Sequence, residues 1–187
     1  MISVDEFSVK TIEFGGFGAA LSALRLPFSK ECRSEVNFFP FNESDINLIQ
    51  YRTVINLNQK DLELMQTLLK RGDEHAKVLR GIVVWCEINA PRYWWQEMAT
   101  YRVGCDGLSS ESTMHTDCKG LSEDELIKAK EEITEGLMQK RVYMFSYQTL
   151  RRIYDQRKNH RLPQWHTFCN WIETLPYSKE LITNGIV

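Results

Sequence analysis

The segment from Ile82 to His115 constrains the fold more than any other part of the sequence. Its first seven residues, IVVWCEI, are apolar and β-branched, which is typical of a buried strand. Asn89 follows at once as a good helix N-cap, and Pro91 suits a first helical turn because its missing N–H would be unpaired there anyway. We therefore expect a strand that runs directly into a helix, followed by a hydroxyl-rich loop.

The helix and loop of this segment predict a site for an anionic ligand. Helix N-termini and loop amides attract phosphate, and serine hydroxyls add further donors. The loop offers Ser109, Ser110, Ser112 and Thr113. Arginine is the side chain that grips phosphate through two parallel hydrogen bonds. For each arginine the alternative is a surface charge or an ion-pair partner. Six arginines are candidates: Arg92, Arg102, Arg151, Arg152, Arg157 and Arg161.

Four large side chains on the expected helix form one apolar stripe. Trp94, Trp95, Met98 and Tyr101 follow one another at helical spacing, which is typical of a face packed into a core. The alternative is an aromatic ring stacked on a flavin or a base. We expect core packing.

The remaining sequence alternates between short strand patterns and amphipathic helices. The capping-box pair Ser122 and Glu125 marks the start of one long helix. The segment from Phe28 to Ile49 is polar and irregular, so we expect a surface excursion there. Strands are predicted at residues 8–14 and 51–57 in addition to 82–88, and helices at 19–26, 59–69, 122–140, 146–160 and 164–174.

Composition excludes several classes of function. The chain has 187 residues and a formal net charge of −2, which suits one domain and argues against a broad nucleic-acid footprint. No apolar run is long enough for a membrane span, and none follows Met1 as in a signal peptide. The five cysteines are irregularly spaced, so we expect free thiols in the cytoplasm.

The usual catalytic and metal-binding motifs are missing from the sequence. The glycines at 15, 16 and 18 fit neither a P-loop nor a dinucleotide-binding loop, and no GxSxG element is present. Cys105, His115 and Cys118 are too loosely spaced to predict a zinc site, so no metal is expected.

The order of these elements resembles the flavin-dependent thymidylate synthases. That family has an Arg-His-Arg signature, seven further residues and then a serine. Here Thr100, Tyr101 and Arg102 occupy the signature, and Ser110 follows at the same interval. Arg152 and Arg161 keep the family's nine-residue spacing between two later arginines. A Gln-Trp pair follows at 164–165, and Glu-His at 74–75 resembles an earlier family element. Met114 stands in place of a loop arginine.

The resemblance implies an α/β (α+β) fold in which a central antiparallel or mixed sheet is flanked by helices, with residues 1–187 in one domain. It implies a homotetramer with active sites between subunits, and methyl transfer from methylenetetrahydrofolate to dUMP with reduced FAD. The residues that it implies for flavin are Arg102, His75 and Tyr101. Those that it implies for the nucleotide are Gln96, Glu97, Ser110, Ser112, Arg151, Arg152 and Arg161.

Two other functions fit the same sequence. One is a protein that binds a nucleotide on this scaffold without flavin or synthase activity. The other is a small interaction protein that presents aromatic residues near its C-terminus, such as Trp165 and Trp171, to a partner.

Overall fold

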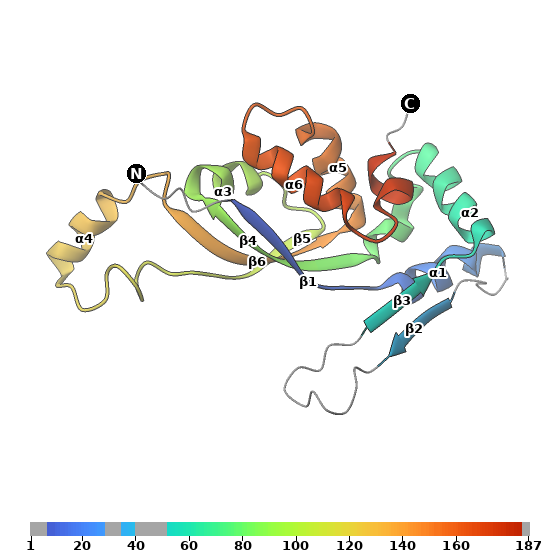
Figure 1. Cartoon of the computed structure of the whole chain (residues 1–187), viewed down its shortest axis with the longest axis horizontal. Helices are drawn as coiled ribbons and strands as arrows, with labels where there is room; N and C mark the ends of the chain where they lie inside the picture. Colours follow the sequence, from blue (N-terminus) through green and yellow to red (C-terminus); the bar gives the residue numbers. More distant parts are fainter. Residues whose placement is uncertain (1–6, 29–34, 40–51, 185–187) are drawn as a thin grey trace.

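The computed structural model describes residues 7–28, 35–39 and 52–184, and a four-stranded antiparallel sheet forms its centre (Figure 1). Within β4, Val84, Cys86 and Ile88 are fully buried and alternate with half-buried residues, so one face of the sheet packs on a core. The expected class, an antiparallel sheet flanked by helices, is confirmed. The strands, in sheet order, are β1 (Ser8–Gly15), β4 (Val83–Pro91), β6 (Met138–Ser146) and β5 (Cys105–Ser110).

Three helices, α3 (Arg92–Met98), α5 (Tyr147–Arg157) and α6 (Pro163–Glu173), cover that face (Figure 1). Their aromatic side chains meet in the core, where the ring centroids of Trp94 and Trp165 are 4.6 Å apart. The predicted apolar stripe on α3 is confirmed as core. Trp165 is fully buried and Trp171 is 8% exposed. The hypothesis that these two rings are presented to a partner is therefore wrong.

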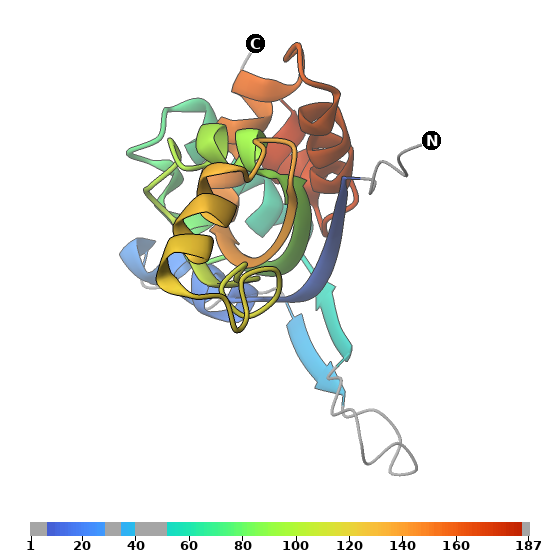
Figure 2. The same ribbon diagram turned by 90° about the vertical axis from the view of Figure 1, so that its left-hand side faces the viewer.

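Other elements extend the molecule at both ends of the sheet. The helices α1 (Phe17–Arg25) and α2 (Gln59–Lys70) lie at one end, joined by an ion pair between Arg25 and the fully buried Asp61. The helix α4 (Glu123–Glu131) projects at the other end and buries none of its residues. Figure 2 shows a separate two-stranded ribbon, β2 (Glu35–Phe39) with β3 (Arg52–Asn56), extending away from the sheet.

Short helical turns complete the chain. They lie at Leu26–Phe28, Ala76–Arg80 and Lys179–Thr183. The predicted capping box is confirmed, because the backbone N–H of Ser122 donates to the Glu125 carboxylate at 3.0 Å. The predicted excursion from Phe28 to Ile49 is wrong at residues 35–39, which form β2, and most of its remainder lies outside the described residues.

The first correction concerns the boundary between β4 and α3. Asn89 pairs with Lys140 and Pro91 pairs with Met138, so the strand continues three residues beyond the predicted end. Asn89 is therefore not a helix cap, and α3 begins at Arg92 with Pro91 before it. Because α3 is short, Arg102 lies after the helix rather than on it.

The second correction concerns the strands β5 and β6. The predicted helix at residues 122–140 ends at Glu131, and residues 138–146 form β6, which pairs with β4 on one side and β5 on the other. Ser109 and Ser110 lie in β5 and not in a loop. Pro163 occupies the first turn of α6, where its missing N–H is harmless.

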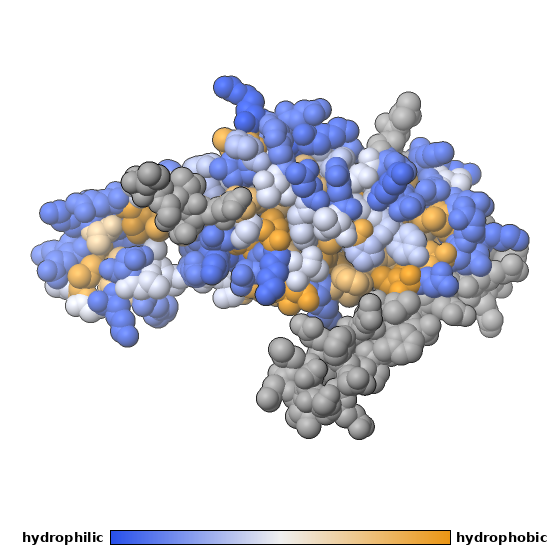
Figure 3. Space-filling view, in the orientation of Figure 1, coloured by the Kyte–Doolittle hydropathy of each residue, from blue (hydrophilic) through white to orange (hydrophobic). Residues whose placement is uncertain are grey.

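The surface differs between the two sides of the sheet. Figure 3 shows hydrophilic side chains over the helices, whereas hydrophobic ones gather on the side of the body away from them. On that side Trp85 of β4 pairs with Met144 of β6, and both are half-buried. No helix in the described part of the chain has the length and apolar character needed to cross a membrane.

Gly16 and Gly18 give a matched test of the turn between β1 and α1. Gly16 has φ 83°, and an added Cβ would lie 1.8 Å from the Gly81 carbonyl oxygen, whereas nothing lies within 4 Å of a Cβ at Gly18. We expect Gly16→Ala to lower the free energy of unfolding by at least about 1–3 kcal/mol. Gly18→Ala should raise it by up to about 1 kcal/mol. Urea unfolding measures both, and equal effects would contradict the assignment.

Candidate functional site

The segment between α3 and β5 is fixed along one face of α5. The Thr149 hydroxyl donates to the carbonyl of Val103 at 2.6 Å, and the backbone N–H of Ser146 donates to that of Gly104 at 2.7 Å. Arg152 Nη2 also donates to the Val103 carbonyl at 3.3 Å. These contacts anchor the backbone of Val103 and Gly104, directly after Arg102. The side chain of Arg102 is exposed.

Gly104 is required for this close approach. Its φ is 74°, and an added Cβ would lie 2.5 Å from the Thr149 hydroxyl and 2.6 Å from the Ser146 hydroxyl. A side chain at this position would push the segment away from α5. The Arg102 backbone is thus positioned by hydroxyl donors and a glycine that the sequence analysis did not single out.

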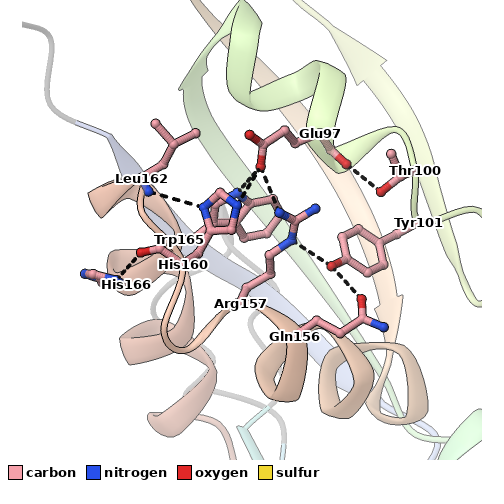
Figure 4. A network of polar contacts seen from close by, with 9 residues as sticks. All are labelled: Glu97, Thr100, Tyr101, Gln156, Arg157, His160, Leu162, Trp165 and His166. Carbon is pink, nitrogen blue, oxygen red and sulfur yellow. Dashed lines mark hydrogen bonds and ion pairs between the residues drawn. The ribbon is translucent and has the colours of Figure 1, made fainter.

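Tyr101 points into the protein and takes part in a polar network (Figure 4). Its hydroxyl donates to Gln156 Oε1 at 2.9 Å and accepts from Arg157 Nε at 2.8 Å. The side chain is 8% exposed. The phenol is therefore satisfied within the protein, at the position where the family signature has histidine.

Glu97 lies at the centre of the same network. Its Oε2 accepts from Trp165 Nε1 at 2.7 Å and from Arg157 Nη1 at 2.9 Å, and His160 Nε2 lies 3.5 Å away (Figure 4). The Arg157 guanidinium also lies over the Trp165 ring, 4.6 Å from its centroid. One carboxylate oxygen thus joins α3 to α5, α6 and the loop between them.

The exposed Arg80 and the half-buried Arg152 lie along one face of α5. Arg80 Nε donates to Gln148 Oε1 at 2.7 Å, and Gln148 is one helical turn from Arg152. Arg102 is exposed and makes no hydrogen bond or ion pair with another described residue. The cationic side chains of Arg80 and Arg152 therefore lie about one helical turn apart along α5, and Arg80 is one that sequence reasoning missed.

The other predicted arginines are placed differently. Arg151 is 5% exposed, and its Nη1 lies 3.4 Å from the Leu181 carbonyl oxygen, so it faces the C-terminal helical turn. Arg161 is exposed and lies beyond the end of α5. Arg152 and Arg161 keep their interval in sequence but do not share a helix.

The predicted serines lie at the far end of β5. Ser110 ends the strand opposite Arg141 of β6, and Ser112 follows, with its hydroxyl accepting from the Met114 backbone N–H at 3.3 Å. Ser110 lies five positions after Cys105, which corresponds to roughly 16 Å of extended strand. One chain therefore does not bring these serines together with Arg102.

Two further predicted residues stand apart from Arg102. Gln96 Nε2 donates to Glu135 Oε2 at 2.8 Å, in the segment before β6. His75 is exposed in the turn before residues 76–80, where its Nε2 lies 3.7 Å from the Glu74 carboxylate.

The buried thiols are not arranged as a metal site. Within the described ranges, no three His, Cys, Asp or Glu side chains come together as potential ligands. Cys105 Sγ lies 2.9 Å from the Tyr101 carbonyl oxygen. Burial raises the pKa of the Cys105 thiol, as does the nearby Asp106 carboxylate, while Arg152 opposes them. The thiol is therefore a poor ligand and a poor nucleophile at neutral pH.

Comparison with solved structures decides the fold. Thymidylate synthase X (ThyX) from Helicobacter pylori, crystallised with FAD and dUMP, superimposes with a TM-score of 0.65 at 14% identity, over 97% of this chain and 99% of that one. The chain has the fold of the flavin-dependent thymidylate synthases. A second ThyX structure from the same organism with FAD and dUMP gives a TM-score of 0.60 at 14% identity, over 93% and 97% of the two chains.

A methylase shares this ThyX-like fold. The UMP/dUMP methylase PolB from Streptomyces cacaoi, bound with 5-Br dUMP, gives a TM-score of 0.62 at 9% identity over 95% of both chains. Neither a protein-family model nor a curated protein matches the sequence. The similarity is therefore one of fold, and function has to be argued from the site.

The Glu97 network predicts a measurable coupling between α3 and α5. In a double-mutant cycle of Glu97→Gln and Arg157→Gln, we expect a coupling free energy of about 1–2 kcal/mol, because the two groups share a network that is mostly shielded from water. The matched control is the exposed pair Asp155 and Lys158, 3.7 Å apart, where we expect no more than about 0.5 kcal/mol. Chemical unfolding of the single and double variants measures both, and equal couplings would contradict the prediction.

Proposed function

We propose that the protein binds a pyrimidine nucleotide on its ThyX-like scaffold. The observation that carries this proposal is the exposed Arg102, whose backbone is held between two anchored residues and whose side chain makes no hydrogen bond or ion pair with a described residue, next to Arg152 on α5. A guanidinium without a charged partner in the described part of the chain is suited to phosphate. Solved structures of the same fold contain dUMP or 5-Br dUMP, which names the ligand class to test.

The separation of the predicted residues supports an assembled site. Ser110 ends β5, and Arg102 lies just before the start of this strand. A ligand that contacts both an arginine and a serine of this kind would therefore take them from two copies of the chain. The uncovered side of the sheet supports assembly, because Trp85, Val142 and Met144 are half-buried and apolar. We infer a homo-oligomer, and the tetramer of the resemblance is the state to test.

Of the three residues that the resemblance assigns to flavin, Tyr101 is engaged in its own network, whereas Arg102 and His75 are exposed. When bound in such enzymes, FAD supplies the hydride for methyl transfer to dUMP. The proposed nucleotide binding does not require a flavin contact from Tyr101. Flavin-dependent dUMP methylation is a second candidate function, favoured by the FAD in the ThyX structures.

The core and the thiols support two further parts of the proposal. The buried apolar residues form one continuous cluster from α1 to the C-terminal turn, which supports a single ThyX-like domain over residues 1–187. The described cysteines are all free and buried, and burial, with a smaller effect from Glu173, raises the pKa of Cys169 to about 11. Such unpaired thiols support the expected cytoplasmic location.

Nucleotide binding should stabilise the folded protein. At a dUMP concentration a hundred times Kd, we expect a gain of about 2.7 kcal/mol, seen as a rise in Tm. Arg102→Gln should reduce the rise, because the free guanidinium is lost, whereas Arg71→Gln, which removes an exposed charge at the end of α2, should leave it unchanged. Melting curves that do not move with any pyrimidine nucleotide would reject the proposed function.

The two candidate functions predict different visible absorbance spectra for the purified protein. If the nucleotide is bound without flavin, the purified protein is colourless, FAD titration leaves its visible spectrum unchanged, and dUMP still raises Tm. A flavin absorbance band in the purified protein, retained through gel filtration, would support the second candidate and contradict binding without flavin. Mass spectrometry of the released ligand identifies what the protein carries.

A further inference from the structure

Arg141 lies directly across from the serine end of β5. The strand register pairs Ser110 with Arg141, and residues paired in this way project to the same face of an antiparallel sheet, with Cβ atoms about 5 Å apart. The face is the one that bears the helices, because Arg141 also pairs with the fully buried Ile88 of β4. The helix predicted over residues 122–140 would end just before Arg141, and the sequence analysis assigned this arginine no role.

The guanidinium of Arg141 is held in a defined position. It lies over the ring of the buried Trp95, 4.5 Å from the centroid, and its Nε and Nη2 donate to Gln139 Oε1 at 3.1 and 2.8 Å. Trp95 is fixed in turn, because its Nε1 donates to the Gln139 carbonyl at 3.0 Å. The remaining nitrogen, Nη1, makes no hydrogen bond or ion pair with another described residue. A stacked, oriented guanidinium with free N–H groups is suited to an oxyanion.

The charge of Arg141 is not neutralised within the described part of the chain. None of the ion pairs there involves Arg141. The neighbouring Glu111 carboxylate accepts the Lys140 backbone N–H at 2.8 Å, and the Glu135 carboxylate accepts Gln96 Nε2. The nearest acidic groups along the strand and the preceding loop are thus engaged elsewhere. Arg141 is half-buried, so part of the residue remains open to solvent.

We propose that Arg141, together with the hydroxyls of Ser110 and Ser112, binds the phosphate group of the nucleotide. This inference rests on the proposed function and identifies which end of the ligand contacts the β5–β6 edge. Met114, 47% exposed, brings no charge to the 111–121 segment, and the neighbouring strand supplies the cation instead. One side of the phosphate contact is then made by two adjacent strands of one chain, and Arg102 of a second copy supplies the other side.

The test compares dUMP with deoxyuridine, which lacks the phosphate, by isothermal titration calorimetry. We expect Arg141→Gln to weaken dUMP binding about tenfold to a hundredfold, the loss of hydrogen bonds to a charged group, and to leave deoxyuridine binding unchanged. Arg141→Lys keeps the charge without the planar fork and should lose less. Ser110→Ala, which does not disturb Trp95, should also reduce the preference for dUMP. Lys140→Gln removes the adjacent exposed charge and should leave the preference intact.

The outcomes separate this inference from the proposed function. If the wild type binds dUMP and Arg141→Gln retains its full preference over deoxyuridine, Arg141 does not bind phosphate. If the wild type binds no pyrimidine nucleotide, the proposed function fails, and inorganic phosphate then tests the site directly. The NMR signal of the Arg141 Nε–Hε group, assigned with Arg141→Lys, should move on phosphate titration. A signal that stays still would overturn the inference.

Discussion

The arrangement of the helices depends on one partly shielded carboxylate. The Glu97 side chain is 33% exposed, and its Oε2 faces Arg157, Trp165 and His160 at 2.9, 2.7 and 3.5 Å. A hydrogen bond to a charged group contributes about 1.5–3 kcal/mol, more than a neutral one, because the ionised acceptor is the stronger partner. These contacts fix α3 relative to α5 and α6, and hence the start of the segment that carries Arg102.

Tyr101 extends this network to the family signature. Its hydroxyl contacts both Gln156 and Arg157, and Arg157 in turn donates to Glu97. A histidine at position 101 would leave at least one of these groups without its partner in a largely buried place, which costs free energy. The two signature departures, at positions 100 and 101, therefore differ in kind. Thr100 is exposed and donates only to the Glu97 backbone carbonyl, whereas Tyr101 is part of the helix packing.

The sequence predicted the elements that have clear periodicity and missed those defined by their partners. The spacing of Leu62, Met65 and Leu69 located α2 to within a residue, and IVVWCEI located the central strand. The strand β6 was missed because its sequence, MQKRVYMFS, contains charged residues and begins only a short segment after a charged helix, and because pairing with β4 and β5 on both sides makes it a strand. The site shows the same limit. Arg102 is exposed and Arg151 is buried, although both are arginines. The spacing of the arginines along the chain did not indicate which of them is exposed.

The missed strand changes where positive charge is available. On a helix, Lys140 and Arg141 are two neighbouring surface charges near its C-terminus. On β6 they project to opposite faces, so that Lys140 is exposed while Arg141 stacks on Trp95 beside Ser110. The strand thereby fixes one cation and leaves the other free to move, and ordering a free lysine side chain around a ligand costs up to about 2 kcal/mol of entropy. A guanidinium that is already stacked on an aromatic ring avoids most of that entropy cost. The register of the strands, more than the net charge, therefore determines where this protein is suited to hold an anion.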